Sequence, residues 1–352
     1  MKGEKRLSNF ELLRCICVVY IILFHCVYKS DIDLNTFSIN TFLIENMYLC
    51  GEMGVNIFIL ISGYFFDKTE FKWRKILDYW CIVQFYTVLS IAIKILVFHE
   101  GYRINGIKEL VRLLLPFSFG RYWFLSAYIL IYIFSPYIKS IVVNLSKNEF
   151  TKIIVFTVGI WCIWATVMGV INSNTTNLTY YHRYFWLFIV YICGIYIKMY
   201  DIPIMNYNKT KLFFVVIVSQ IVNAIYIVIY NLYPEIMNKI GFCEATFFWR
   251  ENSILCFGSS IFLFMYFSKL NIKYSKIINT VASTSFGVYL IHDGLLQNNI
   301  WGNLVHVNEY MDSWFCILYI IVSIILIYIA CALIEYMRQI ISNHIGRIVK
   351  RN

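Results

Sequence analysis

The sequence predicts an all-α membrane protein, a bundle of about ten transmembrane helices. Of the 352 residues, 60% are hydrophobic and 14% are charged, and the mean hydropathy is +0.67, so polar side chains are too few to cover a water-soluble surface. The apolar residues gather in nearly charge-free runs of roughly 17 to 25, the length of helix that crosses about 30 Å of hydrocarbon. These runs lack the alternation of a β-barrel, and a helix satisfies its own backbone hydrogen bonds in lipid.

Ten such runs follow one another along the chain. They lie near residues 9–28, 50–66, 76–98, 122–142, 153–171, 184–200, 211–231, 253–268, 277–297 and 314–337. If the N-terminus is cytoplasmic, most of the 30 Lys and Arg residues fall in inward loops, which predicts that both termini are cytoplasmic. No connecting stretch is long enough for a second folded unit. We therefore expect residues 1–352 to form a single membrane domain without an appended soluble domain.

The cysteines and the positive charge have ordinary explanations in a membrane protein. Most of the 11 cysteines lie in apolar runs, where Cys acts as a small apolar residue, and no C-x-x-C or Cys–His spacing of a metal site occurs. The net charge of +10 is spread over many short loops rather than one patch. We expect no metal site, no nucleic-acid partner, and the lipid bilayer as the surrounding medium.

The first span carries three polar side chains on one face. At 100° per residue, Glu11, Arg14 and His25 share a sector of about 60°, and Arg14 and His25 are separated by about 16 Å of helix rise. Because ionisable groups are costly in lipid, they should face the protein interior or a wet cavity, which makes them candidate catalytic residues. The alternative is a Glu11–Arg14 ion pair that reaches toward water and a His25 that bonds to a neighbouring helix.

Further candidates lie in three other spans. His292 ends the segment Ser285–His292 at a height similar to that of His25, which favours a shared cavity, although a helix-packing role is equally open. Ser62 and Tyr64 end a span rich in small residues, and Trp123 opens the fourth span, where an aromatic belt is the alternative.

A basic cluster follows the second span. Lys72, Arg74 and Lys75 would lie at the cytoplasmic surface, where they could bind phosphate groups. A role in fixing the topology or in contacting anionic lipid explains the same residues.

Several of these segments, in this order, resemble the acyltransferase 3 family of bacterial membrane O-acyltransferases. The family pattern of an acid, Leu-Arg, ten residues and His is similar to Glu11-Leu-Leu-Arg14 followed by His25, and Asn9–Arg14 is similar to members from capsule and exopolysaccharide gene clusters. Further similarities are Gly54 to Tyr64, Tyr122-Trp123-Phe124, and Phe286 to His292.

The resemblance implies an enzyme of the bacterial cytoplasmic (inner) membrane. It would use acyl-CoA, usually acetyl-CoA, as a co-substrate without a bound cofactor, and acylate a hydroxyl of a surface polysaccharide or lipid-linked carbohydrate. Many members carry Arg-x-x-Arg after the second span, whereas this chain has Lys72-Trp73-Arg74-Lys75, and Lys lacks the bidentate fork of Arg.

Acyl transfer to an alcohol needs a base or nucleophile, and a site for the CoA phosphates. We expect His25 to act as base or as transient acyl carrier, with Glu11 orienting Arg14. Arg14 and the Lys72–Lys75 cluster would face the CoA phosphates, and the acceptor would lie near Ser62, Tyr64, Trp123 and His292. The rival interpretation is a transporter or exporter of a glycan or small metabolite, in which the His and Arg track would carry protons or substrate.

Overall fold

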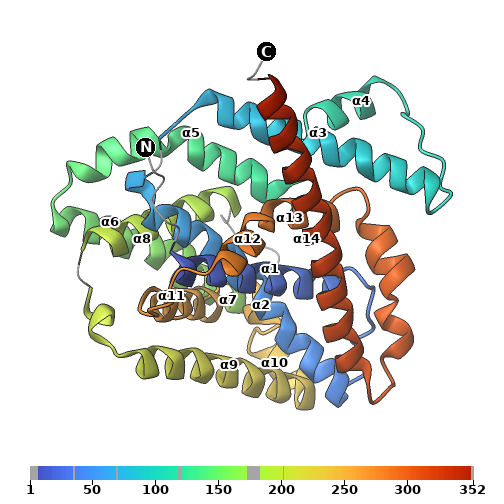
Figure 1. The fold of residues 1–352 in the computed structure, drawn as a ribbon. Helices are drawn as coiled ribbons and strands as arrows, with labels where there is room; N and C mark the ends of the chain where they lie inside the picture. Colours follow the sequence, from blue (N-terminus) through green and yellow to red (C-terminus); the bar gives the residue numbers. More distant parts are fainter. Residues whose placement is uncertain are drawn as a thin grey trace. The chain divides into compact units, whose positions relative to one another are not determined.

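Helices supply all the regular secondary structure in the part of the chain that the computed structural model describes (Figure 1). The described residues are 7–34, 36–68, 70–117, 121–172, 183–200 and 202–349. The predicted all-α class is therefore confirmed. The longer helices are α1 (Ser8–Tyr28), α2 (Ile39–Tyr64), α3 (Trp73–Leu96), α5 (Trp123–Val143), α6 (Lys147–Val158), α8 (Arg183–Met199), α9 (Lys209–Leu232), α11 (Ile254–Ser268) and α14 (Cys316–Val349).

Shorter helices complete the fold. They are α4 (Ile107–Leu114), α7 (Ala165–Ile171), α10 (Pro234–Lys239), α12 (Lys276–Ser283) and α13 (Ser285–His292). Two π-helical segments also occur, Gly159–Trp164 between α6 and α7, and Asn299–Val305 after α13. Segments of this kind are often found at functional sites.

Seven helices among the described residues are long and apolar enough to cross a membrane. They are Ser8–Tyr28, Ile39–Tyr64, Trp73–Leu96, Trp123–Val143, Lys147–Ile171, Lys209–Leu232 and Cys316–Ile345. The other three predicted spans coincide with shorter helices: α8 has 17 residues, α11 has 15, and α12 and α13 are interrupted at Thr284. Membrane spanning by seven helices is thus supported, while the count of ten and the cytoplasmic termini stay predictions.

The second helix differs most from its predicted bounds. It begins at Ile39 instead of near residue 50, with Ser38 as its N-cap and Thr41 completing a capping box. The added turns contain polar residues that neighbouring helices satisfy: Asn231 donates to Glu45 over 2.9 Å and Asn223 to Asn46 over 3.4 Å. These partners explain why a hydropathy pattern alone places the helix start too late.

The chain divides into two compact units that interleave in sequence. Unit 1 takes in residues 1–32, 73–123 and 273–352, and unit 2 takes in residues 33–72 and 124–272. The prediction of a single membrane domain is not tested by this division.

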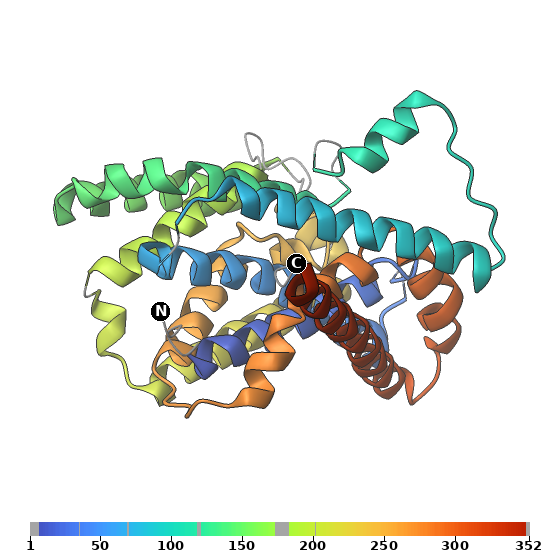
Figure 2. The same cartoon turned by 45° about the horizontal axis from the view of Figure 1, so that its top comes forward.

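In unit 1, α1 packs against α12, α13 and α14. The Ser8 hydroxyl joins α1 to α12, since it accepts hydrogen bonds from the Ser275 backbone N–H (2.9 Å) and the Asn279 amide (3.1 Å). After α3 the chain turns back, so that the end of α4 returns to α3 (Figure 2), where the Trp80 indole donates to the Leu114 carbonyl over 2.8 Å. Unit 1 thus holds α1 and α13, the two helices with the candidate histidines, against each other.

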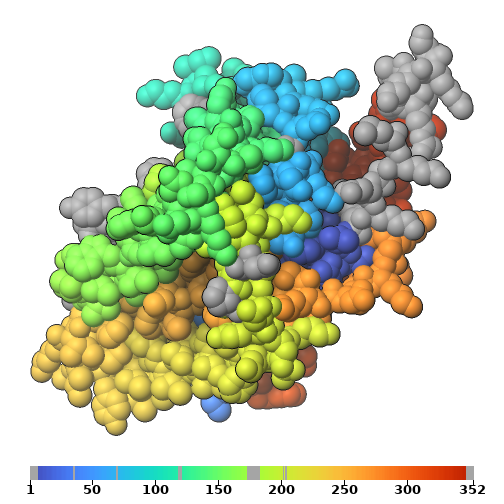
Figure 3. Space-filling view, turned by 90° about the vertical axis from the view of Figure 1, so that its left-hand side faces the viewer, coloured from blue at the N-terminus to red at the C-terminus, as the bar shows by residue number. Residues whose placement is uncertain are grey.

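In unit 2, α2 packs along α8 and against α9 and α11. The α2–α8 contact depends on two glycines, because a Cβ atom on Gly194 would lie 3.0 Å from the Gly63 Cα. Figure 3 shows helices of unit 2, coloured green to yellow, at the surface, and α6 and α9 expose large apolar side chains such as Phe156 and Phe214. An outward apolar surface of this kind suits lipid.

Candidate active site

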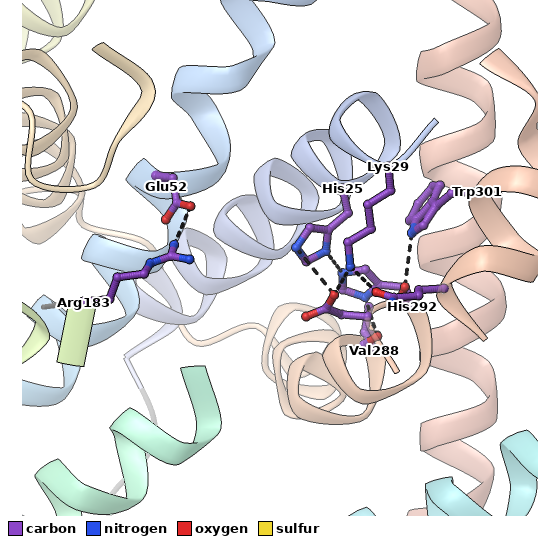
Figure 4. Close-up of polar contacts among 9 residues, drawn as sticks. His25, Lys29, Glu52, Arg183, Val288, His292 and Trp301 are labelled. Atoms are coloured by element: carbon purple, nitrogen blue, oxygen red, sulfur yellow. Dashed lines mark hydrogen bonds and ion pairs between the residues drawn. The ribbon is translucent and has the colours of Figure 1, made fainter. Parts of the chain in front are cut away.

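Two histidines form a buried pair in unit 1. His25, in the last turn of α1, and His292, the last residue of α13, approach to 3.0 Å between His25 Nδ1 and His292 Nε2 (Figure 4). Both residues are buried, His292 completely. The sequence places them at similar heights, and the structure brings them into direct contact.

The second nitrogen of His292 decides the tautomer of both rings. His292 Nδ1 lies 2.6 Å from the Val288 carbonyl oxygen, which can only accept, so Nδ1 carries the hydrogen and donates it. In a neutral His292, Nε2 must then accept, and its donor is His25 Nδ1–H. The neutral His25 ring therefore has its lone pair on Nε2, the nitrogen that is able to take up a proton.

A carboxylate stands beside that nitrogen. The Asp293 Oδ1 atom lies 3.8 Å from His25 Nε2, close enough to act as counterion when His25 becomes protonated. Lys29, one helical turn after His25, donates to Asp293 and to Gln297 (Figure 4). The group thus contains one base, one counterion and one balancing cation.

The segment after α13 supports the histidine pair. The Trp301 indole, in the second π-helical segment, donates to the His292 carbonyl over 3.2 Å. Asn299 in the same segment donates over 2.5 Å to Glu100, which also accepts from Lys94 over 3.0 Å. These two donors, Lys94 first, lower the pKa of Glu100 below its ordinary value. The exposed carboxylate thereby links the end of α3 to this segment.

Glu11 and Arg14 form an ion pair near the other end of α1. Arg14 Nη1 donates to Glu11 Oε1 over 2.5 Å, the i,i+3 pair considered from the sequence. Arg14 remains part-exposed while Glu11 is buried. Since α1 is continuous, the pair and His25 stay about 16 Å apart in helix rise and do not form one cluster.

The basic residues after α2 each have contacts of their own in the structure. The side chain of Lys72 is largely exposed and its Nζ lies 3.1 Å from Glu70 Oε2, while its backbone N–H donates to the Tyr132 hydroxyl. Arg74, which is exposed, and Lys75 lie in the first turn of α3, with Lys75 Nζ 5.7 Å from the centre of the Tyr79 ring. Lys72 belongs to unit 2 and the other two to unit 1.

Ser62 and Tyr64, two of the residues expected around the acceptor, have contacts within unit 2. The Ser62 hydroxyl donates to the Phe58 carbonyl of its own helix over 2.9 Å. Tyr64 is the last residue of α2, with Lys198 Nζ 4.9 Å from its ring centre, and both belong to unit 2. The expectation that Tyr64 contacts the acceptor stays a prediction.

Trp123 and His292, the other two residues expected around the acceptor, both belong to unit 1, and their role at the acceptor stays a prediction. Trp123 begins α5, but its neighbour Tyr122 is the residue that donates to the Leu290 carbonyl on α13, over 3.3 Å. His292 engages both ring nitrogens within the protein and is completely buried.

Several polar residues of the core were missed in the sequence. Lys29 follows His25 at i+4 and Asp293 adjoins His292, so helical spacing and adjacency were available signals. Glu335 lies in the last predicted span and accepts from Tyr86, Arg338 and Gln339. Among the described residues, no group of three or more His, Cys, Asp or Glu side chains is arranged to hold a metal ion.

An apolar helical protein with a histidine pair and a carboxylate buried inside it is a membrane protein equipped for acid–base chemistry. The sequence model of the acyltransferase 3 family, described as an acyltransferase domain, matches residues 7–334, and the chain belongs to this family. The resemblance based on the Glu11–His25 pattern and the later segments is thus confirmed. No curated protein and no solved structure matches the chain.

Proposed function

We propose that this membrane acyltransferase moves an acetyl group from cytoplasmic acetyl-CoA to a hydroxyl of a carbohydrate that is lipid-linked or outside the bacterial inner membrane. The observation that carries the proposal is the 3.0 Å contact between the two histidines, from which the tautomer of His25 follows. Its Nδ1 is committed to His292 at 3.0 Å, which leaves the basic lone pair on Nε2.

The histidine pair supplies the proton steps of the transfer. The acceptor oxygen attacks the thioester carbonyl carbon while its proton passes to His25 Nε2, forming a tetrahedral intermediate. The C–S bond then breaks, and the proton on Nε2 passes to the departing sulfur, giving CoA thiol and the ester. Asp293, 3.8 Å away, stabilises the imidazolium between these steps, and His292 is a positioning residue.

A two-step route uses the same nitrogen. His25 Nε2 attacks the thioester carbonyl carbon, the C–S bond breaks, and CoA leaves as the thiolate while the acetyl group rests on the imidazole. The acceptor hydroxyl oxygen then attacks the acetyl carbon, the bond to Nε2 breaks, and the hydroxyl proton passes to the CoA thiolate. Both routes require an unprotonated Nε2, so the geometry serves either.

The donor is proposed to enter from the other end of α1. Arg14, oriented by Glu11 over 2.5 Å, and the cluster of Lys72, Arg74 and Lys75 would attract the CoA phosphates. The extended pantetheine arm of CoA then spans the rise of about 16 Å between Arg14 and His25.

The test follows label from acetyl-CoA in isolated membranes. The intact protein should transfer radiolabelled acetyl to glycan, and His25→Ala should abolish the transfer while the protein remains inserted. His344→Ala, which alters an exposed histidine near the end of α14, is the matched control and should retain activity. Full activity of His25→Ala would refute the assignment. Proton-coupled flux without label on glycan would support the transporter instead.

A further inference from the structure

Unit 2 contains a second buried polar cluster, formed by Glu52, Arg183, Arg250, Glu251 and Asn252 and called here the Glu52 cluster. Arg183 Nη2 donates to Glu52 Oε1 over 2.7 Å (Figure 4), and its Nε donates to Glu251 Oε1 over 2.5 Å. The Glu52 and Glu251 side chains are 4% and 0% exposed, whereas Arg183 is 32% exposed. Arg183 thus joins α2 to the segment before α11 through two buried carboxylates, and burying two carboxylates is costly unless their hydrogen bonds are satisfied.

The hydrogen bonding of the Glu52 cluster is incomplete. Glu52 Oε2, Asn252 Oδ1 and Arg250 Nε are buried atoms that have no hydrogen-bond partner among the residues the structure describes. Glu52 and Asn252 are 3% and 0% exposed as whole residues. Because buried polar atoms are nearly always satisfied, three such atoms in one cluster indicate a missing group.

The cluster is held rigidly from several elements. Asn252 Nδ2 donates over 2.9 Å to the Trp161 carbonyl, which lies in the π-helical segment Gly159–Trp164. Asn56 Nδ2 donates over 2.7 Å to the Glu251 carbonyl, and the Trp186 indole donates to Asn56 Oδ1 over 3.0 Å. The residues next to the incomplete positions are therefore fixed in place, as in a preorganised binding site.

The unpartnered atoms specify the chemistry of the missing group. Glu52 Oε2 and Asn252 Oδ1 need donors, while Arg250 Nε needs an acceptor. An ammonium ion only donates and an unprotonated anion only accepts, whereas hydroxyl groups, and water, do both. The Arg250 guanidinium lies 4.2 Å from the centre of the Trp249 ring, which places an aromatic side chain beside these atoms.

We propose that the Glu52 cluster binds hydroxyl groups of the carbohydrate acceptor. The inference rests on the proposed function, because it states which residues hold the acceptor of that reaction. Glu52 and Asn252 accept hydrogen bonds from sugar hydroxyls, and Arg250 donates one. Arg183 holds the two carboxylates in position.

The decisive experiment compares two buried carboxylates of the same helix. Glu52→Gln removes the negative charge of the Glu52 side chain from the cluster. Glu45→Gln is the matched control, because Glu45 is also buried, lies two helical turns earlier on α2, and accepts from Asn231 over 2.9 Å. The probes are alkali-deacylated surface polysaccharide from the host cell and radiolabelled acetyl-CoA, with membranes that contain equal amounts of each variant.

Glu52→Gln should raise the KM for the polysaccharide about ten- to hundredfold, since a hydrogen bond to a charged group is lost. The KM for acetyl-CoA should not change, and Glu45→Gln should change neither value. An unchanged polysaccharide KM in Glu52→Gln, or an equal fall of kcat alone in both variants, would overturn the inference.

If Glu52→Gln does not accumulate in the membrane, Arg250→Lys decides by the same criteria, because it keeps the charge and removes the Nε donor.

Failure of the proposed function looks different from failure of this inference. In the first case the unaltered protein transfers no label to polysaccharide, which removes both proposals. In the second the protein transfers label normally while the acceptor KM is insensitive to Glu52 and Arg250.

Discussion

Replacing Asp293 by Asn tests the electrostatics of the histidine pair. The substitution keeps the size of the side chain and removes the charge that faces His25 Nε2 at 3.8 Å. If His25 takes up a proton during the reaction, the imidazolium loses its counterion. We therefore expect kcat to fall strongly, with little change in the KM for acetyl-CoA.

The size of the effect follows from the distance. Two unit charges 3.8 Å apart interact by about 4 kcal/mol at an effective dielectric constant near 20. Lys29 donates to the same carboxylate and offsets part of this attraction. A net loss of about 2 to 4 kcal/mol in transition-state stabilisation corresponds to a rate reduced roughly 30- to 1000-fold.

A double-mutant cycle separates this effect from misfolding. In Asp293→Asn alone, Lys29 is left as an uncompensated cation beside His25, whereas Asp293→Asn combined with Lys29→Met removes both charges. The double variant should be about tenfold more active than Asp293→Asn, so the two effects should not be additive. Acetyl transfer in membranes, normalised to the amount of inserted protein, measures all four members of the cycle.

Two outcomes would refute this reasoning. Asp293→Asn with the full rate would show that no positive charge develops on His25. A double variant with the product of the two single losses would show that Lys29 and Asp293 act independently, contrary to the ion pair between them.

Two further predictions concern packing and donor binding. Gly63→Ala should lower the stability of the folded protein by about 1–3 kcal/mol, because the new Cβ would meet the backbone of Tyr191 and Gly194. Gly258→Ala is the control and should not lower the stability, because no atom lies within 4 Å of its new Cβ. Heating in detergent, with detection of the remaining folded protein, measures this difference. Lys72→Ala combined with Arg74→Ala should raise the KM for acetyl-CoA without changing kcat, and an unchanged KM would reduce these residues to a topology signal.

The helices were predictable where hydropathy alone decides them. α1, α3, α5, α9 and the Lys147–Ile171 segment lie within a few residues of the predicted spans, apart from the early start at Lys147. The start of α2 was not predictable from hydropathy, because Glu45 and Asn46 are residue types typical of loops. In the structure Asn231 and Asn223 supply their hydrogen-bond partners. The break at Thr284 was also hidden, because both flanking helices belong to one apolar run.

The site was predictable only as far as contacts within one helix reach. The 3.6-residue period relates Glu11 to Arg14 and places Lys29 one turn after His25, and the structure shows interactions in both regions. The helical period cannot identify Arg183 as the partner of Glu52, because Arg183 is 131 residues away in the sequence and starts a different helix. Yet a carboxylate in an otherwise charge-free run already implies a partner, since an unpaired charge in lipid is so costly. The acidic residues within the predicted spans therefore mark Glu52 and Glu335 as members of ion pairs whose partners the sequence does not name. Only the packing of the helices identifies Arg183 and Arg338 as these partners.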